Sequence, residues 1–148
     1  MRVAAYDPGE STGWATGDIV GKALENIQSG YGPFVLVAKD LYTVMHGDEP
    51  YDTVIYESWR LRKDKANEFI GSPILPIQAV GFTRAAVLFT HPSTNIVSQE
   101  PAIKHVIDKQ MAGFGYPNYL PASDGAEHAR DAVRHLWYYA VNKKGVRP

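Results

Sequence analysis

Residues 4–15 read AAYDPGESTGWA, and this stretch decides the fold. An apolar run ends on Asp7, directly before a Pro-Gly pair that is typical of a turn. A buried strand gains nothing from ending on a carboxylate, because a carboxylate that loses water without a partner is strongly penalised. The stretch therefore predicts a strand and a turn that deliver Asp7 to a place where another group compensates its charge.

The composition is that of an ordinary globular protein. The chain has 148 residues, 45% hydrophobic and 21% charged, which fits one domain over 1–148 and argues against disordered and fibrous classes. Fifteen basic and sixteen acidic residues give a net charge of -1, so any nucleic-acid surface is a local patch. The lack of cysteine excludes disulfides and Cys-ligated zinc. Without a signal-peptide core or a bilayer-length apolar run, we expect a cytoplasmic protein that contacts no membrane.

The hydrophobic periodicity predicts an alternating order of strands and helices. Three strands come first, at 2–7, 14–20 and 22–30, and the turn at 8–13 joins the first two into a hairpin. The segments that follow are a helix over 33–49, a strand over 51–58, a helix over 77–90, a strand over 93–100, a helix over 101–113 and a last helix from near Asp124 to about Lys144. This order predicts an α/β fold with an antiparallel hairpin leading into parallel strands.

Three acids occupy comparable places in this scheme. Asp7 ends the first strand, Glu57 ends the fourth, and Asp131 lies one or two turns into the last helix. Strand ends in open α/β sheets form the crevice where ligands bind. Three converging carboxylates repel one another unless a cation lies between them, and hard oxygen ligands select Mg²⁺ or Mn²⁺. The residues therefore predict a divalent metal site, with room for two ions of the kind used in phosphoryl chemistry.

The last helix is expected to carry one packing face and one chemical face. His128, Asp131 and His135 are three and four residues apart, so they share a face. Asp124 and Glu127, in the sequence DGAE, are interpreted as helix caps and not as metal ligands.

Four segments, in order along most of the chain, resemble a known family. YDPGESTGWA at 6–15, VIYESWR at 54–60 and HARDAVRHLWYY at 128–139 resemble the two acidic strands and the C-terminal acidic helix of the RuvC-type Holliday junction resolvases. EPAIKHVI at 100–107 is similar to the start of a helix in the same family. The resemblance implies an RNase H-like fold of the integrase superfamily, with helices on both faces of a mixed five-stranded sheet.

The resemblance also implies an activity, a cofactor and partners. It implies a Mg²⁺-dependent endonuclease, usually a homodimer, that resolves Holliday junctions and other branched DNA in recombination and repair. Asp7, Glu57 and Asp131 carry over as catalytic metal ligands for two Mg²⁺ ions, which Mn²⁺ can replace. His128 stands where many relatives have a fourth acid, so it is expected to ligate metal or orient the attacking water. The chain is short for the family, which suggests a phage-encoded member acting in a bacterial or phage-infected cell.

Basic residues beyond Glu57 are candidates for DNA contact, because phosphate contacts position DNA without reading its sequence. They are Arg60, Arg62, Lys63 and Lys65, joined by Lys104 at the start of the helix over 101–113. The helix over 77–89 is apolar on more than one face, so it is expected to be buried either under the sheet or against a second copy of the chain. We favour the second copy, which would give a homodimer.

Three other functions remain open on sequence grounds. A related RNase H-like nuclease would share the metal site but act on flaps, RNA-DNA hybrids or structured RNA. An actin-like nucleotide-binding protein would need a second phosphate turn, and no repeat of DPGEST occurs. A catalytically silent junction-binding module would be marked by a missing acid, and all three are present.

Overall fold

The computed structural model describes residues 1–58, 74–112 and 126–147, and it confirms the predicted mixed α/β sheet. Five strands form one sheet in the order β3-β2-β1-β4-β5. Their bounds are β1 (Arg2–Asp7), β2 (Ser11–Val20), β3 (Ala23–Pro33), β4 (Thr53–Glu57) and β5 (Asn95–Gln99). The helices of the described residues are α1 (Phe34–His46), α2 (Leu75–Thr90), α3 (Ile103–Met111) and α4 (Glu127–Lys144).

The pairing brings three strand ends to one edge of the sheet. β1 runs antiparallel to β2, with Asp7 opposite Gly13. It runs parallel to β4, which in turn runs parallel to β5 with Glu57 opposite Gln99. The carboxyl ends of β1, β4 and β5 therefore lie side by side, as ligand sites in α/β sheets require.

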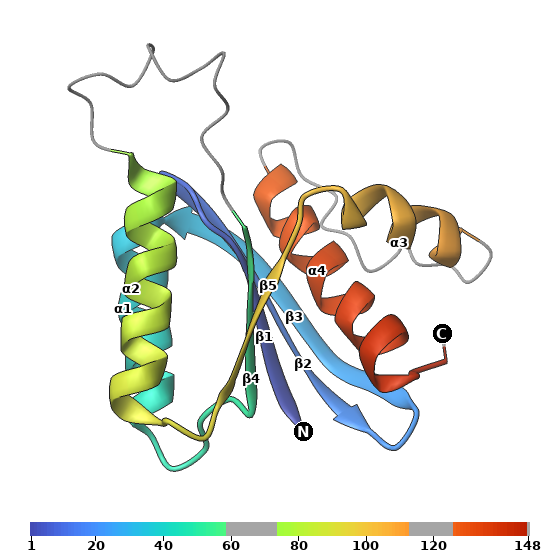
Figure 1. The fold of residues 1–148 in the computed structure, drawn as a ribbon, viewed down its shortest axis with the longest axis horizontal. Coiled ribbons are helices and arrows are strands. Elements are labelled where there is room, and N and C mark those ends of the chain that lie inside the picture. Colours follow the sequence, from blue (N-terminus) through green and yellow to red (C-terminus); the bar gives the residue numbers. More distant parts are fainter. Residues whose placement is uncertain (59–73, 113–125, 148) are drawn as a thin grey trace.

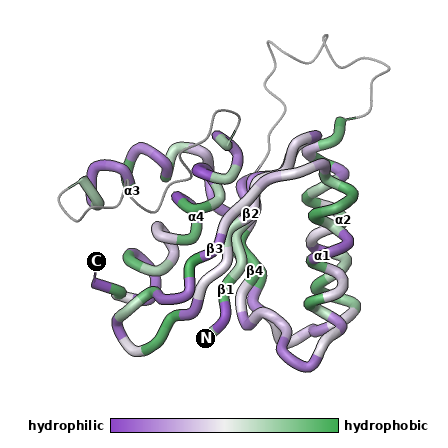
Figure 2. Tube along the Cα trace, turned by 180° about the vertical axis from the view of Figure 1, so that it is seen from behind, coloured by the Kyte–Doolittle hydropathy of each residue, from purple (hydrophilic) through white to green (hydrophobic). Residues whose placement is uncertain are grey.

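Helices cover both faces of the sheet, as predicted: α1 and α2 lie on one side and α3 and α4 on the other (Figure 1). Side chains of a strand alternate between the two faces. Val3, Ala5 and Ile55 accordingly pack in a core with α4, whereas the intervening Ala4 and Val54 pack in a second core with α1. Hydrophobic segments run through the central strands between these layers (Figure 2).

The first hairpin is longer than the sequence predicted. β2 begins at Ser11 and not at Trp14, because Ser11 pairs with Pro33 and Gly13 pairs with both Asp7 and Tyr31. β3 accordingly extends to Pro33, although it was expected to end at residue 30. The predicted turn over 8–13 is thus shorter, and the strand that faces Asp7 continues to the very edge of the sheet.

The four predicted helix starts each differ from the structure by one to three residues: α2 begins at Leu75 and not at residue 77, and α3 begins at Ile103 and not at residue 101. α4 begins at Glu127, and its N-cap is Ala126, whose side chain makes no capping hydrogen bond. The predicted cap Asp124 lies outside the described residues, and Glu127 is an exposed residue of the first turn. α1 begins at Phe34, because Pro33 has the extended dihedral angles of the strand before it (φ −53°, ψ 136°).

The helix α2 was expected to be buried either under the sheet or against a second copy of the chain, and its exposed side chains show how far the sheet covers it. Only Ala79, Thr83, Ala86 and Val87 are buried, and Phe82 packs its ring edge-to-face on Phe34 of α1. The opposite side of α2 stays exposed, with Phe89 88% accessible. Of the part of the chain that the structure describes, the sheet and α1 cover one side of α2. Within the described ranges, no helix has the length and apolar character of a membrane span.

Gly13 sets how closely α4 approaches the sheet. A Cβ atom added at Gly13 would lie 1.9 Å from the backbone oxygen of His128 and 2.7 Å from the backbone nitrogen of Ala129. These are backbone atoms, so a side chain at residue 13 can be accommodated only by moving the start of α4. The missing side chain therefore lets the acidic helix sit directly on β2, next to Asp7.

We expect Gly13→Ala to lower the free energy of unfolding by about 1–3 kcal/mol or more, as overpacking does, and to disturb the site even where the protein still folds. Urea denaturation measures the change. Gly47→Ala is the matched control, because Gly47 is exposed, ends α1 with extended dihedral angles (φ −80°, ψ 179°) and has room for a Cβ. Equal stability of the two variants would contradict the role of Gly13.

Candidate metal centre

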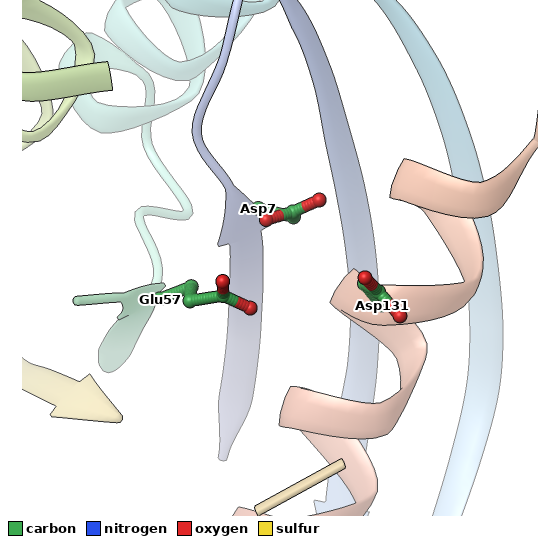
Figure 3. A group of neighbouring side chains, drawn as sticks. All are labelled: Asp7, Glu57 and Asp131. Carbon is green, nitrogen blue, oxygen red and sulfur yellow. The ribbon is translucent and has the colours of Figure 1, made fainter. Parts of the chain in front are cut away.

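The three predicted acids meet at the edge of the sheet. Asp7 ends β1, Glu57 ends β4, and Asp131 lies in the second turn of α4. Their side chains point toward one another (Figure 3), and one carboxylate oxygen of each lies within 4.8 Å of the others. Asp7 is 7% exposed, and the other two are partly buried. Residues up to 124 positions apart in the sequence thus form one acidic cluster.

The alternation of strand side chains explains why the cluster forms on this face. Asp7 follows Val3 and Ala5 on the side of β1 that packs against α4. Glu57 follows Ile55 on the same side of β4. Asp131 is on the surface of α4 that faces these strand ends, so both strands and the helix contribute one acid each.

His128 is the partner of Asp7. Its Nδ1 lies 2.6 Å from Oδ2 of Asp7, and its side chain is 45% exposed. The structure therefore places this fourth predicted site residue next to one of the acids, with part of the ring open to solvent. The backbone contact at Gly13 fixes its position.

Lys104 lies inside the acidic cluster. Its Nζ is 2.5 Å from Oε2 of Glu57 and 2.5 Å from Oδ2 of Asp131. Sequence reasoning assigned Lys104 to DNA contact, and the structure places its ammonium between two carboxylates at the start of α3. It thus compensates part of the negative charge of the site.

The buried His135 holds Glu57 from the other side. Its Nε2 is 2.7 Å from Oε2 of Glu57, and its Nδ1 is 2.7 Å from Oε1 of Gln99. His135 is fully buried. It does share a face with His128 and Asp131, as expected, but that face continues into the interior instead of ending at solvent.

Asp131 is held by Arg134, one turn later in α4. The guanidinium donates from Nη1 to Oδ1 of Asp131 at 2.8 Å, and from Nε to Asp108 of α3 at 3.0 Å. Each acid of the cluster therefore has at least one hydrogen-bond donor from a different part of the chain.

Burial and neighbouring charge move the ionisation of two acids in opposite directions. Burial, and then the charge of Glu57, raise the pKa of Asp7, and the hydrogen bond from His128 only partly offsets this. Burial also raises the pKa of Glu57, but the hydrogen bonds of His135 and Lys104 outweigh it, so the pKa of Glu57 is below its usual value. Of these two acids, Asp7 is thus the one that the protein stabilises less as a carboxylate.

The pKa of Lys104 is raised above its ordinary value. Burial disfavours the ammonium, but the hydrogen bonds to Asp131 and Glu57 more than compensate. Lys104 therefore stays positively charged at neutral pH.

The donor set fits a hard divalent cation. Three carboxylates that converge within 4.8 Å, with an imidazole beside them, offer the oxygen-rich set that Mg²⁺ and Mn²⁺ prefer. Such a cation would stabilise the carboxylate of Asp7, which burial and the charge of Glu57 disfavour. The residues that could hold it are Asp7, Glu57, Asp131 and His128.

Two further groups of residues bear on the site, the predicted DNA contacts beyond Glu57 and the residues that the sequence did not indicate. The basic residues Arg60, Arg62, Lys63 and Lys65 lie outside the described residues, so their DNA contact stays a prediction. Sequence reasoning missed two residues that support the partners of the acids, which are Gln99 next to His135 and Asp108 next to Arg134. A polar side chain at the end of β5 was the available signal for Gln99, because it marks the same sheet edge as Glu57.

Comparison with known proteins shows similarity in fold. A scan against models of protein families found no match, and a search of curated proteins also found none. Among solved structures, T. thermophilus RuvC in complex with a Holliday junction substrate is 18% identical, with a TM-score of 0.58 over 98% of this chain and 96% of that one. The fowlpox virus Holliday junction resolvase is 15% identical, with a TM-score of 0.59 over 97% of this chain and 99% of that one.

A complex of the fowlpox resolvase with junction DNA is also similar, at 16% identity and a TM-score of 0.55 over 92% of this chain and 97% of that one. Together these structures confirm that the chain has the RNase H-like fold of RuvC-type resolvases.

The raised pKa of Asp7 predicts that this acid destabilises the metal-free protein. Its folded pKa exceeds the unfolded value of about 3.9, so stability is lost as pH rises from the unfolded value through the folded one. We therefore expect Asp7→Asn to raise the Tm of the metal-free protein at pH 7, and the gain to shrink below about pH 4. Thermal unfolding in chelator measures it.

Asp48→Asn, in the exposed loop before β4, is the control and should leave Tm unchanged. A lower Tm for Asp7→Asn at pH 7 would mean that His128 already compensates the charge of Asp7.

Proposed function

We propose that this protein is a metal-dependent endonuclease that resolves Holliday junctions and related branched DNA. The observation that carries the proposal is the convergence of Asp7, Glu57 and Asp131 within 4.8 Å at the edge of an RNase H-like sheet. The similar structures of RuvC and of the fowlpox resolvase with junction DNA support this substrate. A cytoplasmic role in recombination or repair, in a bacterial or phage-infected cell, would follow from it.

The proposed cofactor is a pair of Mg²⁺ ions, for which Mn²⁺ can substitute. Asp7, Glu57 and Asp131 would hold them, and His128 would complete the set or orient the attacking water. When bound, the ions supply a nucleophile at neutral pH by acidifying water and stabilise the attacking and leaving oxygens of a phosphodiester. The oxygen-rich donor set supports this choice of metal.

The chain's own residues prepare the site for a polyanion. His135, Lys104 and Arg134 fix the orientations of Glu57 and Asp131 before any substrate arrives. The Lys104 ammonium stays charged at neutral pH. It lies at the acids, next to the place where a scissile phosphate would lie. Such preorganised charges act without reorganisation when the reaction takes place.

The cluster argues against a silent binding module, because three clustered acids hinder the approach of a phosphate unless they hold cations. Lys104 partly neutralises them, yet Asp7 keeps a raised pKa. Cleavage of flaps, RNA-DNA hybrids or structured RNA would use the same site. Parallel assays on a four-way junction, a flap, a duplex and a hybrid distinguish these substrates.

We expect the wild-type protein to cleave a four-way junction only with Mg²⁺ or Mn²⁺. Asp7→Asn and Glu57→Gln should each lower the cleavage rate at least about 100-fold while leaving junction binding intact, because metal catalysis supplies several kcal/mol and each 1.36 kcal/mol is tenfold. Cleavage on denaturing gels and gel-shift binding measure the two effects.

Asp48→Asn is the matched control, since it makes the same chemical change at an exposed position near the opposite end of β4. Metal-independent cleavage, or full activity of both acid variants, would show that these acids do not form the catalytic site.

We also propose that the protein is a homodimer through the helix around residues 77–89. The helices α1 and α2 expose a set of large apolar side chains, and Figure 2 shows hydrophobic segments along α2. The set comprises Val35, Leu36, Tyr42, Ile77, Phe82, Leu88 and Phe89. Such a patch marks an interaction surface, and a twofold dimer would offer two sites to a four-armed substrate.

Phe89→Lys tests the dimer, because Phe89 is 88% exposed and its replacement removes no intramolecular packing. We expect the wild type to sediment as a dimer at micromolar concentration and Phe89→Lys to sediment as a monomer. Val20→Lys is the control: Val20 is 55% exposed at the end of β2, away from α2. A monomeric wild type, or a Phe89→Lys variant that stays dimeric, would rule out this interface.

A further inference from the structure

The buried imidazole of His135 lies between the acidic cluster and Gln99. Its Nε2 is 2.7 Å from Oε2 of Glu57, and its Nδ1 is 2.7 Å from Oε1 of Gln99. No part of His135 is exposed, and it lies on α4 between Val133 and Leu136, which are fully buried members of the hydrophobic core. A polar ring in such a place is unfavourable unless its hydrogen bonds are made.

The chemistry of the two partners fixes one hydrogen of the ring. A carboxylate can only accept hydrogen bonds, so the contact with Glu57 requires a hydrogen on Nε2 of His135. On the other side, the amide nitrogen of Gln99 has no hydrogen-bond partner among the described residues. Exchanging the amide oxygen and nitrogen would let this nitrogen donate to Nδ1 of a neutral ring. In either orientation of Gln99, Nε2 of His135 donates to Glu57.

The donors on Glu57 leave one of its oxygens for a ligand. Oε2 of Glu57 receives the hydrogen bonds of both His135 and Lys104. Among the described residues, none donates a hydrogen bond to Oε1. Because Lys104 has a flexible side chain and His135 is packed in the core, His135 is the donor that can define the orientation of the carboxylate. Gln99 opposes Glu57 in the β4–β5 pairing, so the same sheet edge supports the ring.

We propose that His135, held by Gln99, is a positioning residue that keeps the Glu57 carboxylate oriented for metal binding through an Nε2–H to Oε2 hydrogen bond. The inference rests on the proposed metal-dependent function. It assigns to a core histidine the role that residues behind metal ligands have in other sites, where their loss weakens metal binding about 10- to 100-fold.

Metal affinity tests the proposal without relying on cleavage. Mn²⁺ binding to the full chain is measured by the loss of the electron paramagnetic resonance signal of free Mn²⁺. We expect His135→Leu, which fills the space without a donor, to weaken Mn²⁺ binding about 10- to 100-fold. His135→Gln should restore most of the affinity, because the glutamine amide nitrogen is as many bonds from Cα as Nε2 of histidine.

Two further variants distinguish a loss of the Glu57 orientation from a loss of protein stability. Val133→Ala makes a cavity on the same helix in the same core, so it should lower Tm but leave Mn²⁺ affinity unchanged. Gln99→Leu removes the support of the ring while His135 stays, and it should weaken Mn²⁺ binding in the same direction. If His135→Leu fails to fold, Mn²⁺ binding to Gln99→Leu tests the proposal in its place.

A spectroscopic signature tests the hydrogen bond itself. Nitrogen-15 chemical shifts of the His135 ring in the wild type should show a hydrogen on Nε2. A bare Nε2, or wild-type Mn²⁺ affinity in both His135→Leu and Gln99→Leu, would overturn the positioning role. A wild type that neither binds Mn²⁺ nor cleaves a junction would instead overturn the proposed function, so the two failures are distinguishable.

Discussion

The repulsion between three carboxylates is the constraint on which the rest of the structure depends. Asp7, Glu57 and Asp131 converge within 4.8 Å in a partly buried place, where like charges interact more strongly than in water. Such a cluster is stable only if donors surround it. The chain supplies a histidine to Asp7, a lysine shared by Glu57 and Asp131, and an arginine to Asp131, so that the acids stay together.

The fold creates this crowding by two backbone features. Parallel pairing of β1 and β4 aligns their carboxyl ends, and the alternation of side chains turns both terminal acids toward α4. The absence of a side chain at Gly13 then lets α4 approach until the backbone of His128 touches β2. Sheet register fixes two acids and helix approach fixes the third, and neither feature involves the acids themselves. The position of the site is therefore determined by packing, and its chemistry by the donors around it.

Much of the fold could be predicted from the sequence, because its signals are local. The apolar runs of β1 and β4 and the helical spacing of α1 and α4 each lie within one short segment. The errors concern segments whose structure depends on a distant partner. Ser11–Gly13 look like a turn in isolation and become a strand by pairing with residues 31–33, twenty positions away. The apolar faces of α2 indicate burial on more than one side, and among the described residues the sheet and α1 cover one of them, so cover by a second copy stays a prediction.

The acids could be predicted and their partners from distant segments of the chain could not, for a physical reason. An acid at the end of an apolar strand is anomalous by itself, so Asp7 and Glu57 were visible as candidates. A histidine at position 135 is unremarkable on a helix, and only the fold brings it to Glu57, 78 positions earlier. Lys104 likewise looked like a surface cation, because its segment does not reveal that it faces two carboxylates. The sequence shows where an acid follows an apolar run. The residues that compensate its charge are brought to it by tertiary contacts, which exist only in the folded chain.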